Sequence, residues 1–251
     1  MTDPVLTLTH EPVPISAKFP QIRSVVYGEP GVGKTTLALS FPRPIVIDTD
    51  GGLEGDAIID VSGEEWSPDG WRDLNAFYFW LKTRLDRCDT IIVDSFDAMV
   101  RFLMNEVTSQ PTKFRTADSW LTSLTDAIPE QRDYLAVQRA MDRFLAQLRQ
   151  TGKHIVLTSS VREPDLTKGQ AKRTINVSPG IEALVMGWTN IAGELTIVKD
   201  KAGARHRVLS TEEGQPTRKA KSRWSTLTPG IVDPTYDLIK AGIAQEDKVQ
   251  K

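Results

Sequence analysis

The segment GEPGVGKTT, residues 28–36, constrains the fold of this 251-residue chain more than any other segment. It follows the β-branched run IRSVVY and precedes the helix-forming run TTLALS, which Pro42 stops. Gly28, Gly31 and Gly33 let the backbone wrap closely enough for consecutive N–H groups to point inward. A strand, a glycine-rich loop and a helix in this order predict a phosphate-binding cradle in a parallel α/β sheet.

The loop also fits the Walker A pattern G-x-x-x-x-G-K-[ST]. In that pattern Lys34 reaches the β- and γ-phosphates of a nucleotide, and the Thr35 hydroxyl ligates Mg²⁺. The predicted cofactors are therefore ATP and Mg²⁺. An ordinary glycine turn is the alternative, and the flanking strand and helix argue against it. The predicted nucleotide-binding residues are Gly28, Glu29, Pro30, Gly31, Val32, Gly33, Lys34, Thr35 and Thr36.

Asp94 closes the apolar run TIIVD, which is short enough to be a central parallel strand. An aspartate in this position downstream of a P-loop is typical of the Walker B carboxylate that holds Mg²⁺. A helix-capping role for Asp94 is the alternative. With the P-loop upstream, the predicted metal ligands are Thr35 and Asp94.

The rest of the chain alternates strand patterns with helix patterns and ends in a hairpin. Strands are predicted at 22–27, 44–48, 57–61, 90–94 and 154–160, and helices at 34–40, 67–85, 96–107, 137–148 and 235–243. Two apolar runs around the turn KDKAG predict a β-hairpin after residue 188. The predicted fold class is α/β, a doubly wound, mostly parallel sheet with helices on both faces and a C-terminal β-hairpin extension.

Composition and charge limit the protein class. The chain suits one domain core at 21–225, with an extended N-terminal arm at 1–20 and a short helix and polar tail at 226–251. A net charge of -2 argues against coating nucleic acid by global charge but leaves local basic loops possible. The sequence shows no membrane-length apolar run and no secretory signal, and it has one cysteine, Cys88. These features predict a cytoplasmic protein without a membrane partner.

Five segments occur in an order and spacing that resemble the RecA-like ATPases: VVYGEPGVGKTTLA, VIDTDGG, TIIVDS, GKHIVLTSS and KAKSRW. More narrowly, residues 21–224 resemble the phage-encoded Sak-type single-strand annealing proteins. The resemblance implies a RecA-like ATPase core that assembles into a homo-oligomer, as a filament or a ring. It implies single-stranded DNA as a partner, a single-strand-binding protein as a further one, and annealing or strand exchange in phage recombination inside the host cytoplasm.

The resemblance also implies roles for single residues. Asp50 occupies the place of the catalytic carboxylate that polarises the attacking water, where the family more often has glutamate. Its shorter arm predicts slow hydrolysis, and a turn-capping role before Gly51 and Gly52 is the alternative. Ser159 and Ser160 stand where the family has a polar sensor, usually glutamine, and a serine reaches less far. Weak coupling between nucleotide and DNA is therefore expected.

Basic residues follow in two groups. The resemblance places a single-strand-binding loop after residue 160, and a solvated loop without this role is the alternative. The predicted DNA contacts are Arg162, Lys168, Lys172 and Arg173. Lys221 and Arg223 match a basic pair that RecA-like filaments insert into the neighbouring subunit's ATP site, in the manner of an arginine finger. A basic strand facing solvent or DNA is the competing interpretation. The predicted catalytic residues are Lys34, Asp50, Asp94, Ser160, Lys221 and Arg223.

Three functions remain open at this stage. The first is a DNA-dependent ATPase. The second is a P-loop kinase of a small molecule or nucleotide, although residues 162–178 contain few of the arginines that a kinase lid needs. The third is a nucleotide-gated interaction module that does not hydrolyse ATP, which Asp50 and the serine sensor make credible.

Overall fold

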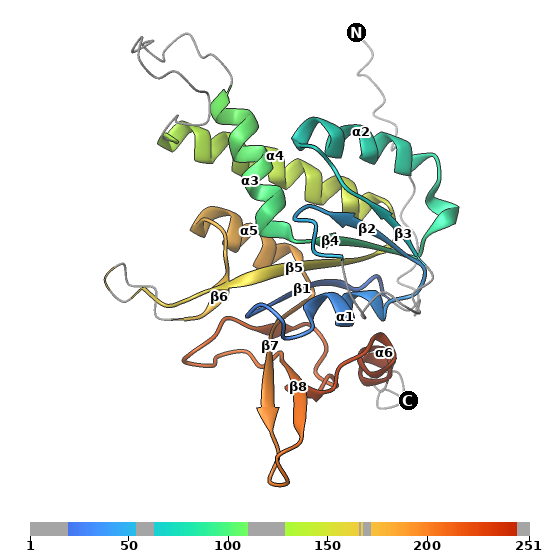
Figure 1. The fold of residues 1–251 in the computed structure, drawn as a ribbon, viewed down its shortest axis with the longest axis vertical. Coiled ribbons are helices and arrows are strands. Elements are labelled where there is room, and N and C mark those ends of the chain that lie inside the picture. The colour runs from blue at the N-terminus through green and yellow to red at the C-terminus, as the bar shows by residue number, and fades with distance from the viewer. Residues whose placement is uncertain (1–19, 54–62, 110–128, 166, 168–171, 245–251) are drawn as a thin grey trace, which may run out of the picture.

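A computed structural model describes residues 20–53, 63–109, 129–165, 167 and 172–244. The strands there are β1 (Arg23–Gly28), β2 (Pro44–Asp48), β3 (Glu64–Trp66), β4 (Thr90–Asp94), β5 (His154–Arg162), β6 (Thr174–Ile175), β7 (Ile191–Lys199), β8 (Arg205–Ser210), β9 (Lys221–Ser222) and β10 (Gly230–Val232). They form one sheet in the order β10-β8-β7-β1-β5-β4-β2-β3, with β6 beside β5 and β9 beside β7 (Figure 1).

The centre of the sheet is parallel and one end is antiparallel. Strands β7, β1, β5, β4, β2 and β3 pair in parallel, whereas β7 and β8 form an antiparallel hairpin to which β10 adds. The hairpin projects from the body of the molecule in Figure 1. The predicted fold class, an α/β fold with a mostly parallel sheet and a C-terminal β-hairpin extension, is confirmed.

Helices cover both faces of the sheet (Figure 1). They are α1 (Lys34–Leu39), α2 (Trp71–Lys82), α3 (Phe96–Ser109), α4 (Gln131–Gln150), α5 (Pro179–Trp188) and α6 (Tyr236–Ala244). Helices α2 to α5 pack on one face, and α1 and α6 pack on the other. Alternate residues of each central strand enter the two cores, as when Ile91 and Val93 face one and Ile92 the other. Burial on both faces explains why these strands are apolar runs without polar alternation.

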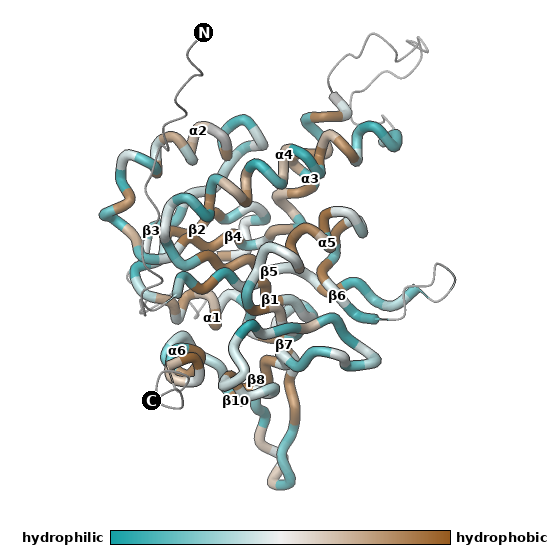
Figure 2. The backbone as a smooth tube through the Cα atoms, turned by 180° about the vertical axis from the view of Figure 1, so that it is seen from behind, coloured by the Kyte–Doolittle hydropathy of each residue, from teal (hydrophilic) through white to brown (hydrophobic). Residues whose placement is uncertain are grey.

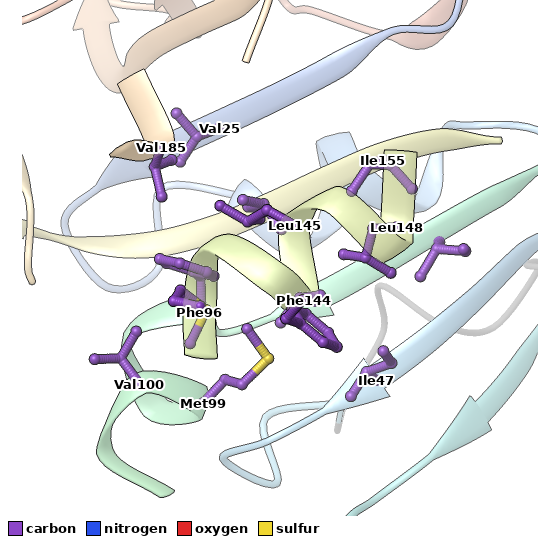
Figure 3. Close-up of a cluster of buried hydrophobic side chains, with 14 of the residues drawn as sticks. Val25, Ile47, Phe96, Met99, Val100, Phe144, Leu145, Leu148, Ile155 and Val185 are labelled. Carbon is purple, nitrogen blue, oxygen red and sulfur yellow. The ribbon is translucent and has the colours of Figure 1, made fainter. Parts of the chain in front are cut away.

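The larger core lies between the sheet and helices α3 and α4. Figure 3 shows Phe96 and Met99 of α3 beside Phe144 of α4, all buried. In α4, Val137, Met141, Leu145 and Leu148 recur at helical spacing and are almost fully buried. Figure 2 shows the corresponding alternation of hydrophobic and hydrophilic segments along α4.

Some predicted boundaries are wrong. Helix α2 begins at Trp71 with Gly70 as its N-cap, not at Ser67 and Pro68, and the Asp73 carboxylate in its first turn accepts a hydrogen bond from the Asp69 N–H at 3.0 Å. Helix α5 and the short strands β3, β6, β9 and β10 were not predicted. The predicted strand at 57–61 and the N-terminal arm lie outside the described residues, apart from one arm residue. Within the described segments, no helix combines the length and apolar content that crossing a membrane requires.

Candidate active site

The carboxyl edge of the sheet brings together residues that are far apart in the sequence. Gly28 at the end of β1 is in register with Ser160 of β5, and Asp48 at the end of β2 is in register with Asp94 of β4. Strand β5 lies between β1 and β4. The glycine-rich loop, Asp94 and the serine pair therefore meet at the edge where ligands bind in parallel sheets.

The loop between β1 and α1 has the backbone that a phosphate cradle requires. Gly31 and Gly33 adopt φ values of 75° and 94°, which side chains rarely tolerate. At Gly28 a Cβ atom would lie 2.4 Å from the carbonyl oxygen of Leu195. Within the described residues, the N–H groups from Gly31 to Lys34 donate to no protein acceptor. N–H donors without a protein acceptor fit the oxygens of a phosphate chain.

The Lys34 ammonium is hydrogen-bonded to the first residues of this loop. Its Nζ donates to the carbonyl oxygens of Gly28 at 3.0 Å and Glu29 at 2.9 Å. Burial lowers the pKa of Lys34, and nearby carboxylates, chiefly Asp94 and Asp97, act in the opposite direction. A partly desolvated cation held among carboxylates is suited to neutralising phosphate charge.

The two predicted metal ligands contact each other. Thr35 Oγ1 donates to Asp94 Oδ2 at 2.6 Å, and the hydroxyl of Thr158 on β5 donates to the other oxygen of Asp94. Burial raises the pKa of the Asp94 carboxyl, although both hydroxyls oppose this shift. No group of three or more acidic, histidine or cysteine side chains in the described part of the chain forms a metal site. Mg²⁺ bound to a nucleotide needs only one or two protein ligands, so Thr35 and Asp94 fit that ion.

Asp48 and Asp50 play different parts in the segment after β2. Asp48 is buried, and its Oδ1 accepts the N–H groups of Asp50, Gly51 and Gly52 at 2.9–3.3 Å. The turn is thus capped by Asp48 and not by Asp50. Asp50 Oδ2 instead accepts a hydrogen bond from Ser95 Oγ at 2.8 Å, which places its carboxylate beside the end of β4.

Ser160 connects three elements next to the loop. Its Oγ donates to Asp97 Oδ2 at 2.8 Å, and its N–H donates to Asp97 Oδ1 at 3.1 Å. The side-chain amide of Asn176, which directly follows β6, donates to Ser160 Oγ at 3.1 Å. The sequence interpretation missed Asp97 and Thr158. Position within their runs was the only available signal, since Asp97 follows the predicted Walker B strand and Thr158 precedes the serine pair.

Arg162 and Arg173, two of the predicted DNA contacts, make ion pairs within the chain. Arg162 contacts Glu182 of α5 and the carbonyl of Val177. Arg173 forms ion pairs with Glu29 in the glycine-rich loop and with Glu194 of β7, each at 2.6 Å. Both arginines therefore have carboxylate partners, a possibility that the sequence interpretation did not consider.

The other two predicted DNA contacts lie in the segment between β5 and β6. Lys172 is half-buried directly before Arg173, and Lys168 lies outside the described residues. Within the described residues, no hydrogen bond or ion pair joins Lys172 to the glycine-rich loop.

Lys221 and Arg223 lie toward the opposite edge of the sheet from the loop. Strand β9 pairs with the start of β7, where Ser222 is in register with Ile191, and Ile191 is in register with Ser24 of β1. Ser24 precedes Gly28 by four residues, or about 13 Å of strand. The Lys221 ammonium donates to the Met186 carbonyl, and Arg223 donates to the Gly187 carbonyl at 3.0 Å, near the C-terminal end of α5. These side chains are therefore directed away from the chain's own loop.

Comparison with known proteins gives one family. Residues 21–224 match a protein-family model described as an AAA domain, which covers most of the chain. No curated protein sequence matches significantly. Among solved structures, a KaiC-like protein from the hyperthermophilic archaeon Pyrococcus horikoshii is similar over 86% of this chain and 91% of that chain, with 14% sequence identity and a TM-score of 0.47.

Proposed function

The chain belongs to this AAA-domain family of nucleotide-binding proteins, and we propose that it is a Mg²⁺-dependent ATPase that acts on single-stranded DNA in phage recombination. The observation that carries the catalytic part is the convergence of Lys34, the Thr35–Asp94 pair and Asp50 at one edge of the sheet. Phosphoryl transfer needs chiefly positioning and charge stabilisation, which these groups supply.

Each residue of this group has a part in hydrolysis. Lys34 neutralises charge on the β- and γ-phosphates, and Thr35 and Asp94 would hold Mg²⁺, which would supply further positive charge there. Asp50 accepts a proton from the attacking water or orients it, because its carboxylate lies beside Asp94 and is fixed by Ser95. The aspartate arm is shorter than a glutamate arm, so turnover is slow.

Assembly completes the site in this proposal. Lys221 and Arg223 lie about 13 Å along the sheet from their own loop, a separation that favours action on a neighbouring copy. Two cations supplied in trans stabilise the charge of the transition state as an arginine finger does. A homo-oligomer in which each interface carries one ATP site follows from this arrangement.

The DNA part of the proposal rests on the resemblance and on the place of the loop after β5. This segment begins after Arg162, two residues beyond Ser160, which is bonded to Asp97 beside the nucleotide site. Ion pairs hold Arg162 and Arg173 at its two ends. We therefore assign contact with the DNA backbone to Lys168 and Lys172, between these anchors.

A mixing experiment tests catalysis and assembly together. Lys34→Ala lacks the phosphate lysine and Arg223→Ala lacks the finger, so each variant alone is expected to be inactive with or without single-stranded DNA. In a one-to-one mixture, about a quarter of randomly assembled interfaces combine an intact loop with an intact finger. ATPase activity that appears on mixing supports the proposal.

Three results would count against the proposal. An inactive mixture contradicts trans action, and wild-type hydrolysis that single-stranded DNA does not change contradicts the DNA part. Phosphate transfer from ATP to a supplied nucleotide acceptor, instead of release as free phosphate, would indicate a kinase.

A further inference from the structure

The base of the β7–β8 hairpin packs directly against the phosphate loop. A Cβ atom added to Gly33 would lie 2.5 Å from Nε and 2.9 Å from Cζ of Arg207, a residue of β8. A Cβ atom added to Gly28, at the other end of the loop, would lie 2.4 Å from the carbonyl oxygen of Leu195 in β7. The two hairpin strands therefore each contact one end of the loop, and β8 places an arginine beside the residue that precedes Lys34.

The backbone of Arg207 is fixed by Asp233, but among the described residues its guanidinium makes no hydrogen bond to a carboxylate. The Arg207 N–H donates to Asp233 Oδ1 at 2.9 Å, and the Asp233 N–H donates to the Arg207 carbonyl at 2.7 Å. The second oxygen of Asp233 lies 2.8 Å from His206 Nδ1. Within the part of the chain that the structure describes, the exposed guanidinium of Arg207 forms no ion pair and donates no hydrogen bond. Asp233 interacts with this guanidinium only through charge, so no hydrogen bond to a carboxylate holds it against Gly33.

Charge and hydrogen-bonding capacity indicate what this side chain binds. Arg207 brings a second cation to the loop that carries Lys34, and an anion bound at the loop would be attracted to both. Lys34 already donates to two carbonyls, whereas the guanidinium of Arg207 retains its N–H donors. A guanidinium binds phosphate oxygens through paired hydrogen bonds, and these are among the stronger hydrogen bonds in proteins.

We propose that Arg207 binds the phosphate chain of ATP as a cation supplied by the same chain, so that β8 forms part of the nucleotide site. The inference rests on the proposed function, because it takes ATP as the ligand of the loop. It assigns Arg207 a role distinct from that of Lys221 and Arg223, which serve a neighbouring copy. Arg207 favours binding of the nucleotide, whereas the trans pair favours the chemical step.

Equilibrium binding of Mg-ATP to the full chain, measured by calorimetry, tests this role. We expect Arg207→Ala to weaken binding about tenfold, the usual effect of losing a charge-assisted hydrogen bond. Arg207→Lys keeps the positive charge but lacks the paired N–H donors of a guanidinium, so it should recover part of the lost ATP affinity. Arg205→Ala is the matched control, because Arg205 is exposed on the same face of β8 but lies farther along the hairpin. We expect it to change binding less than twofold.

Steady-state kinetics separate binding from a merely structural role. Arg207→Ala should raise KM about tenfold and change kcat less than threefold, with an unchanged melting temperature in the absence of nucleotide. Equal or tighter ATP binding by Arg207→Ala, while wild type binds ATP, overturns this inference alone, and tighter binding would mean that the guanidinium covers an empty loop. A wild-type chain that binds no ATP overturns the proposed function as well.

Discussion

The glycine-rich loop and the basic segments of this chain differ in how their side chains are used. At the loop, Lys34 and Thr35 lie where the motif predicts, and the distant Asp94 meets them. Among the basic segments, Arg162 and Arg173 are neutralised by glutamates of their own chain. A motif whose role depends on local backbone is readable in sequence, whereas the role of a charge depends on which opposite charges the fold brings near it.

The largest expected effect is at Lys34. Lys34→Ala should lower kcat/KM for ATP about a thousandfold, because it removes a cation from the developing charge on the phosphates. Lys201→Ala, at the exposed hairpin tip, is the control and should leave ATPase activity unchanged. Comparable activity of the two variants in a steady-state assay would show that the loop does not bind the phosphates in the predicted way.

Substitutions at Asp50 and Asp48 are expected to separate a catalytic role from a structural role. Asp50→Asn should lower kcat about a hundredfold and leave ATP affinity and melting temperature unchanged, since it removes a base and keeps the side-chain volume. Asp48→Ala should instead reduce the free energy of unfolding by about 1–3 kcal/mol, because it leaves turn N–H groups without their acceptor. Thermal unfolding and single-turnover assays measure the two effects. A large loss of stability in Asp50→Asn would contradict a catalytic role for Asp50 and indicate a structural one.

A substitution at Arg173 tests whether the arginines of the basic segments stabilise the fold. Glu194 is 1% exposed, so Arg173→Ala should cost about 2 kcal/mol of unfolding free energy, with Arg218 at 3.6 Å compensating in part. Lys172→Ala should change stability by less than about 0.5 kcal/mol. Adding Glu194→Gln to Arg173→Ala should restore part of the loss in denaturant titrations. Unchanged stability of Arg173→Ala together with lost DNA binding would mean that Arg173 binds DNA.

The smallest expected effect is a pH dependence at the hairpin. Hydrogen bonds to the carboxylates of Asp233 and Asp200 raise the pKa of His206 above its ordinary value. The folded state therefore favours the charged ring, and this stabilisation is complete below the ordinary pKa of about 6.5 and lost as pH rises through the raised value. The melting temperature of wild type minus that of His206→Gln should fall across this range. A difference in melting temperature that does not change with pH would contradict the ion pairs of His206 with Asp233 and Asp200.

Much of the fold was predictable, and the failures have physical causes. Strands β1, β2, β4 and β5 and helix α4 were read from apolar runs and helical spacing, because both faces of the sheet are covered. The two- and three-residue strands β6, β9 and β10 were not, since pairing with longer strands creates them. Helix α5 was missed because Gly180 and Gly187 interrupt a mostly apolar run whose period is hard to see.

By itself, the sequence determined the glycine-rich loop, its lysine and threonine, and the aspartate that ends β4. These depend on backbone conformation at Gly31 and Gly33 and on strands that the apolar pattern marks. Only the tertiary structure decided that Asp48 caps the turn, that Arg207 lies on the loop, and that Arg173 pairs with Glu29, a residue 144 positions away. Charge interactions act through space, so their partners are fixed by strand order and register and not by neighbourhood along the chain.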